Sequence, residues 1–176
     1  MTISLYHAVV PQYLQLLPGV IANLDKAEAW AKDQGLSEAE MLAHKLAPDM
    51  LPLAAQFRMV AGHSGGALQA VSEGVFRVNT TPAPQDYASV RADLTTALAA
   101  VQAIDAAVLD ARQNDNVDFE YGGTVIMSFT AQDYLLSFAQ PNFYFHAVTA
   151  YAILRNLGLE VGKRDYLGAP RVKHPA

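Results

Sequence analysis

YLLSFAQPNFYFHAVTAYAIL, residues 134–154, is a stretch without a single Asp, Glu, Lys or Arg. Its length of twenty-one residues equals that of a membrane-spanning helix. Polar side chains interrupt the run at Gln140, Asn142 and His146, however, and no basic cluster flanks it. We therefore predict a helix that is buried on nearly all sides, in a protein core or a subunit interface, and no membrane partner.

Three other segments carry apolar residues at helical spacing. They are residues 3–33, residues 48–73 and residues 86–103. Pro11 and Pro18 interrupt the first of them, so that helix either starts late or bends. Pro48 suits the first turn of the second helix, where a missing N–H group costs nothing.

The remaining segments complete the expected topology. Residues 37–40, SEAE, form a capping box that opens a short helix through about residue 44. Alternating runs flank Gly122-Gly123, which indicates a β-hairpin, and Thr130 caps the last helix. The tail after residue 158 is expected to be a loop. The sequence thus predicts an all-α protein, an up-and-down four-helix bundle with a small β-hairpin before the last helix.

The composition limits the classes of protein to which this chain can belong. Of 176 residues, 52% are apolar and 16% charged, so we expect one globular domain over residues 1–176. The net charge of −5 offers no basic surface to phosphates, which argues against nucleic acid as a partner. The absence of cysteine excludes disulfides and cysteine nucleophiles. The N-terminal residues MTISLYHAVV lack the basic start of a signal peptide, so a soluble, cytoplasmic protein is expected.

The segment GHSGG, residues 62–66, fits the G-x-S-x-G nucleophile elbow of serine hydrolases. An elbow needs a strand, a sharp turn and a helix at the edge of a parallel sheet, yet residues 1–56 contain no convincing strand. The downstream histidines that could serve as its base are His146 and His174. A serine hydrolase using Ser64 is therefore the third and least favoured hypothesis.

His63 is the second candidate in the same segment. On one continuous helix it shares a face with Gln56 and Met59, and three glycines within five residues surround it. These glycines allow either the close approach of another helix or space for a ligand or metal. On the last helix, Asn142 and His146 are four residues apart and point the same way. A buried histidine bonded to a carbonyl or hydroxyl group is the simpler alternative to a metal ligand.

Several long motifs point to a known family. PNFYFHAVTAYAILRNLG (residues 141–158) followed by EVGKRDYLG (160–168) resembles the signature of the DUF1993 family. TISLYHAVVPQYL (2–14), LAPDMLPLAAQF (46–57) and the histidine before Gly65-Gly66 support the resemblance, which covers essentially the whole chain. DUF1993 is similar to the DinB/YfiT-like superfamily of four-helix bundles, which implies a fold of that kind and a homodimer.

The resemblance also implies a site. DinB-like proteins hold a metal on three histidines, one from the second long helix and two from an H-x-x-x-H on the last. His63 and His146 match two of these positions, but the third falls on Asn142, whose amide is a neutral and weak ligand. One hypothesis is a weakly held divalent metal, Zn or Ni, on His63, Asn142 and His146, supporting hydrolase or thiol-transferase chemistry. The alternative is a non-catalytic, stress-related protein that binds a small molecule in the same pocket. Whether the protein is an enzyme stays open.

Overall fold

Helices make up most of the structure, a computed structural model that describes residues 3–173. His174 lies outside the described residues. The helices are α1 (Leu5–Asp33), α2 (Glu38–Leu42), α3 (Leu53–Ala61), α4 (Ala67–Glu73), α5 (Tyr87–Ala103), α6 (Ala106–Ala111), α7 (Ala131–Asp133), α8 (Gln140–Asn156) and α9 (Lys163–Leu167), with two π-helical segments, η1 (Gly62–Gly66) and η2 (Tyr134–Ala139). The strands are β1 (Val75–Arg77), β2 (Asn116–Tyr121) and β3 (Thr124–Thr130).

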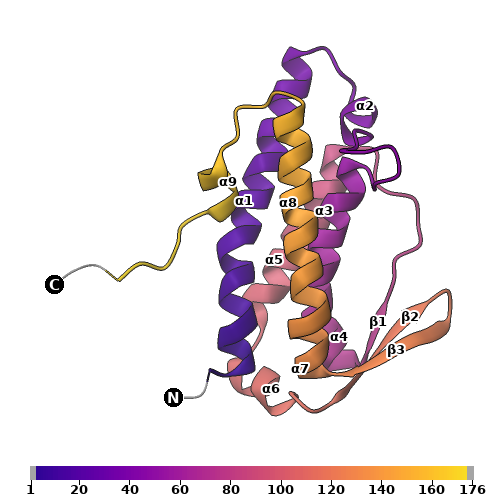
Figure 1. Ribbon diagram of the computed structural model, residues 1–176, viewed down its shortest axis with the longest axis vertical. Helices are drawn as coiled ribbons and strands as arrows, with labels where there is room; N and C mark the ends of the chain where they lie inside the picture. Colours follow the sequence, from indigo (N-terminus) through magenta and orange to yellow (C-terminus); the bar gives the residue numbers. More distant parts are fainter. Residues whose placement is uncertain (1–2, 174–176) are drawn as a thin grey trace.

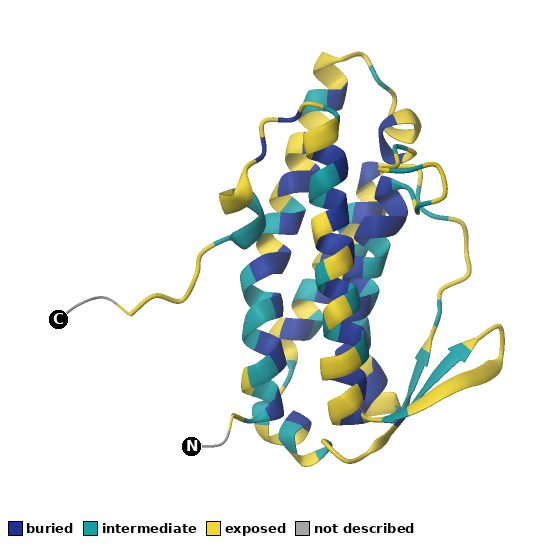
Figure 2. Ribbon diagram, viewed as in Figure 1, coloured by how far each residue is buried: buried dark blue, intermediate teal, exposed yellow. Residues whose placement is uncertain are grey.

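The long helices pack lengthwise around a common core (Figure 1). Helix α3 contacts α5 and α8, and α1 contacts α5 and α8. The rings of Tyr13 and Phe143, both fully buried, meet edge to face at 4.7 Å between centroids and join α1 to α8. Buried residues face inward along these helices (Figure 2). The predicted helical bundle is confirmed, although the sheet is larger than expected.

Helix α1 begins at Leu5 and contains both Pro11 and Pro18, so it does not start late. Ser4 caps it by accepting a hydrogen bond from the backbone N–H of His7. Each proline removes one hydrogen bond within the helix. The long buried face of α1, which includes Tyr13 and Leu17, offsets this cost.

The second long helix begins at Leu53, and the prediction of a start at Pro48 is wrong. Pro52 stands at the N-cap position in an extended conformation. A proline restricts the residue before it to extended backbone, so Leu51 cannot continue a helix from Pro48. The chain instead turns over residues 43–52 before α3 starts.

The small sheet has three strands in the order β1-β2-β3. β2 and β3 are antiparallel and are joined at Gly122-Gly123, both with positive φ. β1, which was not predicted, pairs in parallel with β2 and places Phe76 opposite Phe119. The three residues of β1 are too few to show a sequence pattern, and Gly74, in the left-handed conformation, marks only the end of α4.

The charge-free run 134–154 forms η2 and most of α8. Thr130 caps α7, the short helix directly before this run, by accepting a hydrogen bond from the N–H of Asp133, and η2 ends at Ala139, two residues before Pro141. Only one face of α8 is buried in the single chain, because Phe145 is 56% and Val148 46% exposed. The expectation of burial on nearly all sides is therefore wrong for the isolated chain. None of the helices within residues 3–173 is long and apolar enough to cross a membrane.

The tail forms a short helix, α9, where a loop was expected. The carboxylate of Asp165 accepts a hydrogen bond from the N–H of Gly162 and pairs with Lys26 of α1 at 2.6 Å. Gln15 donates to the carbonyl of Leu167. Because the contacts with Lys26 and Gln15 come from α1, about 140 residues earlier in the chain, the local sequence of the tail did not reveal them.

Candidate functional site

The segment GHSGG forms the π-helical segment η1 inside a continuous helical stretch that includes α3 and α4. Ser64 is fully buried, and its hydroxyl donates to the carbonyl oxygens of Val60 at 2.7 Å and of Ala61 at 3.3 Å. Residues 53–61 are helical, so the strand and sharp turn of a nucleophile elbow are absent from this segment. The interpretation of Ser64 as an exposed nucleophile is wrong.

Neighbouring elements pack against the glycines of η1. A Cβ atom on Gly65 would lie 2.6 Å from both the Cα and the carbonyl oxygen of Ala97, so this glycine lets α5 approach closely. Cβ atoms on Gly62 and Gly66 would lie 3.8 and 3.9 Å from the ring of Phe76, at ordinary contact distance. Close helix packing, one of the two explanations left open by the sequence, accounts for Gly65.

The structure brings His63 and His146 together. Their rings are parallel within 4° and their centroids are 5.8 Å apart. His63 is 5% and His146 7% exposed. On its other side His63 stacks on Phe76, with an angle of 17° and centroids 5.5 Å apart. The π-helical turn of η1 places His63 so that its ring lies between the strand residue Phe76 and the helix residue His146.

Gln56 holds the ring of His146. Nδ1 of His146 lies 2.7 Å from Oε1 of Gln56, and Nε2 of Gln56 donates to the carbonyl of Leu51 at 3.0 Å. Nδ1 of His63 is buried and has no hydrogen-bond partner among residues 3–173. The Nε2 atoms of His63 and His146 form no hydrogen bond with the described residues, and neither Nε2 atom is fully buried. Both Nε2 atoms are therefore open to the adjoining pocket.

Both imidazoles are neutral at pH 7. Burial, and to a smaller extent the nearby His146, lower the pKa of His63 to about 4. Burial alone lowers the pKa of His146 to about 4. A neutral imidazole with a free Nε2 is able to accept a proton, bind a metal or accept a hydrogen bond.

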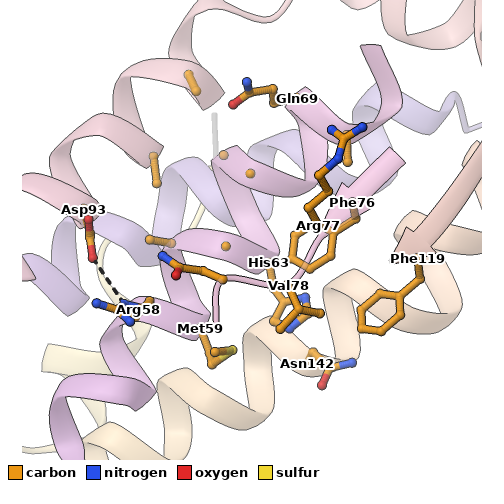
Figure 3. A pocket seen from close by; sticks show the side chains of 18 of the residues that line it. Arg58, Met59, His63, Gln69, Phe76, Arg77, Val78, Asp93, Phe119 and Asn142 are labelled. Carbon is orange, nitrogen blue, oxygen red and sulfur yellow. Dashed lines mark ion pairs between the residues drawn. The ribbon is translucent and has the colours of Figure 1, made fainter. Parts of the chain in front are cut away.

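Asn142, the third predicted site residue, lines the same pocket but does not bond to either histidine. Its Nδ2 donates to the carbonyl of Phe138, four residues back in the same helical segment, at 2.8 Å. Its Oδ1 accepts no hydrogen bond from residues 3–173. In Figure 3, Asn142 lies on the same side of the pocket as His63 and Val78.

The pocket has a volume of about 660 Å³ and lies between the η1 region, α5, β1 and α8. Such a volume is usual for small-molecule sites. Aromatic rings and small residues dominate its wall, with charged groups among them. The aromatic rings are Phe76, Phe119 and Phe138; the small residues include Ala61, Gly62, Gly66, Ala70, Ala97 and Ala100; the charged groups are Arg58, Asp93, Glu73 and Arg77. Arg58 pairs with Asp93 at 3.8 Å (Figure 3), and Arg77 pairs with Glu73 at 3.7 Å.

The sequence did not reveal the roles of Gln56, Phe76 and Phe119. Gln56 is seven residues before His63 on the same helical face, and this spacing was the available signal. Phe76 belongs to the strand β1 that the sequence did not predict. Phe119 lies in β2, opposite Phe76.

The donor set fits a divalent metal only weakly. Nδ1 of His146 lies within hydrogen-bond distance of an amide oxygen, as is common in metal-binding histidines, and its Nε2 has no partner among residues 3–173. Two imidazoles and the neutral Oδ1 of Asn142 fall short of the three imidazole or carboxylate ligands usual for catalytic zinc. Within residues 3–173 no three His, Cys, Asp or Glu side chains group in a way that could hold a metal.

The fold and the site define a class: a mostly helical bundle of DinB-like fold with a histidine pair in a pocket between helices. A solved structure, the crystal structure of a DinB family member protein from Shewanella denitrificans, is similar over 97% of this chain and 96% of that chain, with 28% identity and a TM-score of 0.78. Residues 5–167 match the family described as a domain of unknown function, DUF1993, and the chain belongs to this family. The comparison with curated proteins gives no match.

Proposed function

We propose that the pocket binds a small organic molecule, with Nε2 of His146 and of His63 as its polar contacts. The observation that supports this proposal is that two neutral imidazoles line a pocket of about 660 Å³, whose wall consists mainly of aromatic, aliphatic and small residues with two pairs of opposite charges among them. Few polar groups in a mostly apolar pocket are typical of small-molecule sites. In this proposal α1, the stretch from α3 to α4, α5 and the η2–α8 helix form an up-and-down four-helix bundle that holds the site.

A ligand screen with a pocket-filling variant tests this proposal. Ala100 lines the pocket, whereas the adjacent Ala99 is exposed and does not. Ligand-observed NMR on a library of small aromatic molecules should yield binders that Ala100→Leu abolishes and that Ala99→Leu retains. Binders unaffected by Ala100→Leu, or a library without binders, contradict the proposal.

A second candidate function is metal-dependent chemistry of hydrolase or thiol-transferase type. The hydrogen bond from His146 to Gln56 favours it, because it leaves Nε2 free as a ligand. His63 and His146 would hold Zn or Ni, with Asn142 as a weak third donor. The bound metal would supply a Lewis acid.

Metal analysis tests this second candidate. Untagged protein grown with added zinc or nickel should contain close to one equivalent of metal, and His63→Ala and His146→Ala should each lose it. His44→Ala, at a histidine outside the pocket, is the control. Metal far below one equivalent in the wild-type protein contradicts the candidate.

A second copy of the chain is the proposed partner. Leu136, Phe145 and Val148 are exposed on the η2–α8 helix, by 39%, 56% and 46%. Exposed apolar residues on the charge-free stretch 134–154 favour pairing with another apolar surface. Analytical ultracentrifugation should show a dimer that Phe145→Glu dissociates; a monomeric wild-type protein contradicts the proposal.

A further inference from the structure

We infer that Gln56 fixes the tautomer of His146, so that the ligand of this pocket is an uncharged aromatic molecule that donates a hydrogen bond from O–H, N–H or S–H to Nε2 of His146. This inference rests on the proposed function, the binding of a small organic molecule. It adds the chemical class of that molecule and the residue that sets the preference.

The orientation of the Gln56 amide is the first step. Gln56 is 1% exposed, and one end of its amide lies 3.0 Å from the carbonyl oxygen of Leu51. A backbone carbonyl only accepts hydrogen bonds, so the amide nitrogen must be at that end. Oε1 of Gln56 therefore points at His146.

The protonation of His146 follows from this orientation. Oε1 of Gln56 lies 2.7 Å from Nδ1 of His146. An amide oxygen also only accepts, so Nδ1 must carry the proton, and in the neutral ring Nε2 then carries a lone pair. The chain from Leu51 through Gln56 thus presents an acceptor, not a donor, to the pocket.

Because Nε2 of His146 accepts a hydrogen bond, the pocket favours a ligand that donates one. The oxygen of a carboxylate or a phosphate group would meet the lone pair of Nε2 without a proton between them, and its desolvation would be uncompensated. Acidic neighbours already offset the charges of the two arginines of the pocket wall: Asp93 lies 3.8 Å from Arg58 and Glu73 lies 3.7 Å from Arg77. Nε of Arg58 is buried without a hydrogen-bond partner among residues 3–173. The phenyl rings of the wall favour an aromatic body on the ligand.

NMR of the imidazole nitrogens tests the tautomer directly. Long-range ¹H–¹⁵N spectra of the wild-type protein at pH 7.5 should show Nδ1 of His146 protonated and Nε2 unprotonated. A His146 that carries its proton on Nε2 overturns the inference. Because this readout uses the wild-type protein, it holds even if a Gln56 variant fails to fold.

A matched pair of probes tests the ligand class. 2-Naphthol and 2-methoxynaphthalene share the ring system, but only the first has a hydrogen-bond donor. We expect 2-naphthol to bind about fivefold more tightly, the effect of one net hydrogen bond. Gln56→Leu should remove this preference. Gln69→Leu should keep it, because Gln69 lines the pocket but bonds to Glu73.

The outcomes separate the inference from the proposed function. Equal binding of the two probes overturns the inference and leaves small-molecule binding in place. A preference that survives Gln56→Leu also overturns it, because Gln56 would then not set the tautomer. If neither probe binds, the proposed function fails for ligands with two rings. The inference is then decided by the NMR measurement of the His146 tautomer.

Discussion

Acidification from pH 7.5 to pH 5 should destabilise the fold by about 4 kcal/mol, through His63 and His146. Burial lowers the pKa of both side chains from 6.5 to about 4. In this pH range the unfolded chain binds protons at both positions and the folded chain binds almost none. Stability is therefore fully present above pH 6.5 and is lost as the pH falls toward 4. Integrating the difference in bound protons between pH 7.5 and pH 5 gives a loss of about 2 kcal/mol in the free energy of unfolding for each histidine.

Urea unfolding followed by circular dichroism at the two pH values measures this loss. The carboxylates with lowered pKa values, those of Glu40, Asp86, Asp118 and Asp165, have ordinary values of 4.5 or 3.8 and contribute at lower pH. His63→Phe should halve the loss to about 2 kcal/mol, because one titrating group remains. His7→Phe, at an exposed histidine, should leave it unchanged. Equal stability at both pH values, or a full loss in His63→Phe, would refute the reasoning.

Four further substitutions test the packing and the role of Ser64. Gly65→Ala should lower the free energy of unfolding by about 2 kcal/mol, because its Cβ would meet the backbone of Ala97. Gly66→Ala, whose Cβ would have its nearest contact at 3.7 Å, should raise the free energy of unfolding by up to about 1 kcal/mol. Equal effects of the two changes in urea unfolding would contradict this prediction. Tyr13→Phe should be neutral or stabilising by about 1 kcal/mol, because the buried hydroxyl has no partner among residues 3–173, and a large loss in thermal unfolding would show an unseen partner. A fluorophosphonate probe should not label Ser64, and Ser64→Ala should change stability by less than about 1 kcal/mol; labelling that disappears in Ser64→Ala would restore the hydrolase hypothesis.

The long helices could be predicted because their patterns are local. The helix over residues 86–103 is observed as α5, and the capping box at Ser37 opens α2 as expected. The strand β1 and the helix α9 could not be predicted in this way. Each is short and is held by partners far along the chain, β1 by β2 and α9 by Lys26 and Gln15 of α1.

The candidate site was only partly predictable. The family resemblance, not the spacing of residues, placed His63 and His146 together, and the structure shows their rings stacked. The bond between Gln56 and His146 joins residues 90 positions apart. No periodicity relates the two. The role of the glycines beside His63 likewise depended on Ala97 and Phe76, which pack against them from other elements.

The acid titration also separates the two candidate functions. If His63 and His146 hold a metal, protons compete with it, and the metal stabilises the folded state in proportion to the logarithm of its concentration. The loss between pH 7.5 and pH 5 would then be larger with zinc than with a chelator. If the imidazoles instead face an organic ligand, burial and their mutual proximity keep them neutral without a metal, as their lowered pKa values indicate. The loss would then be the same in zinc and in chelator. One pair of unfolding curves therefore decides whether His63, Asn142 and His146 form a metal site or line a pocket for an organic molecule.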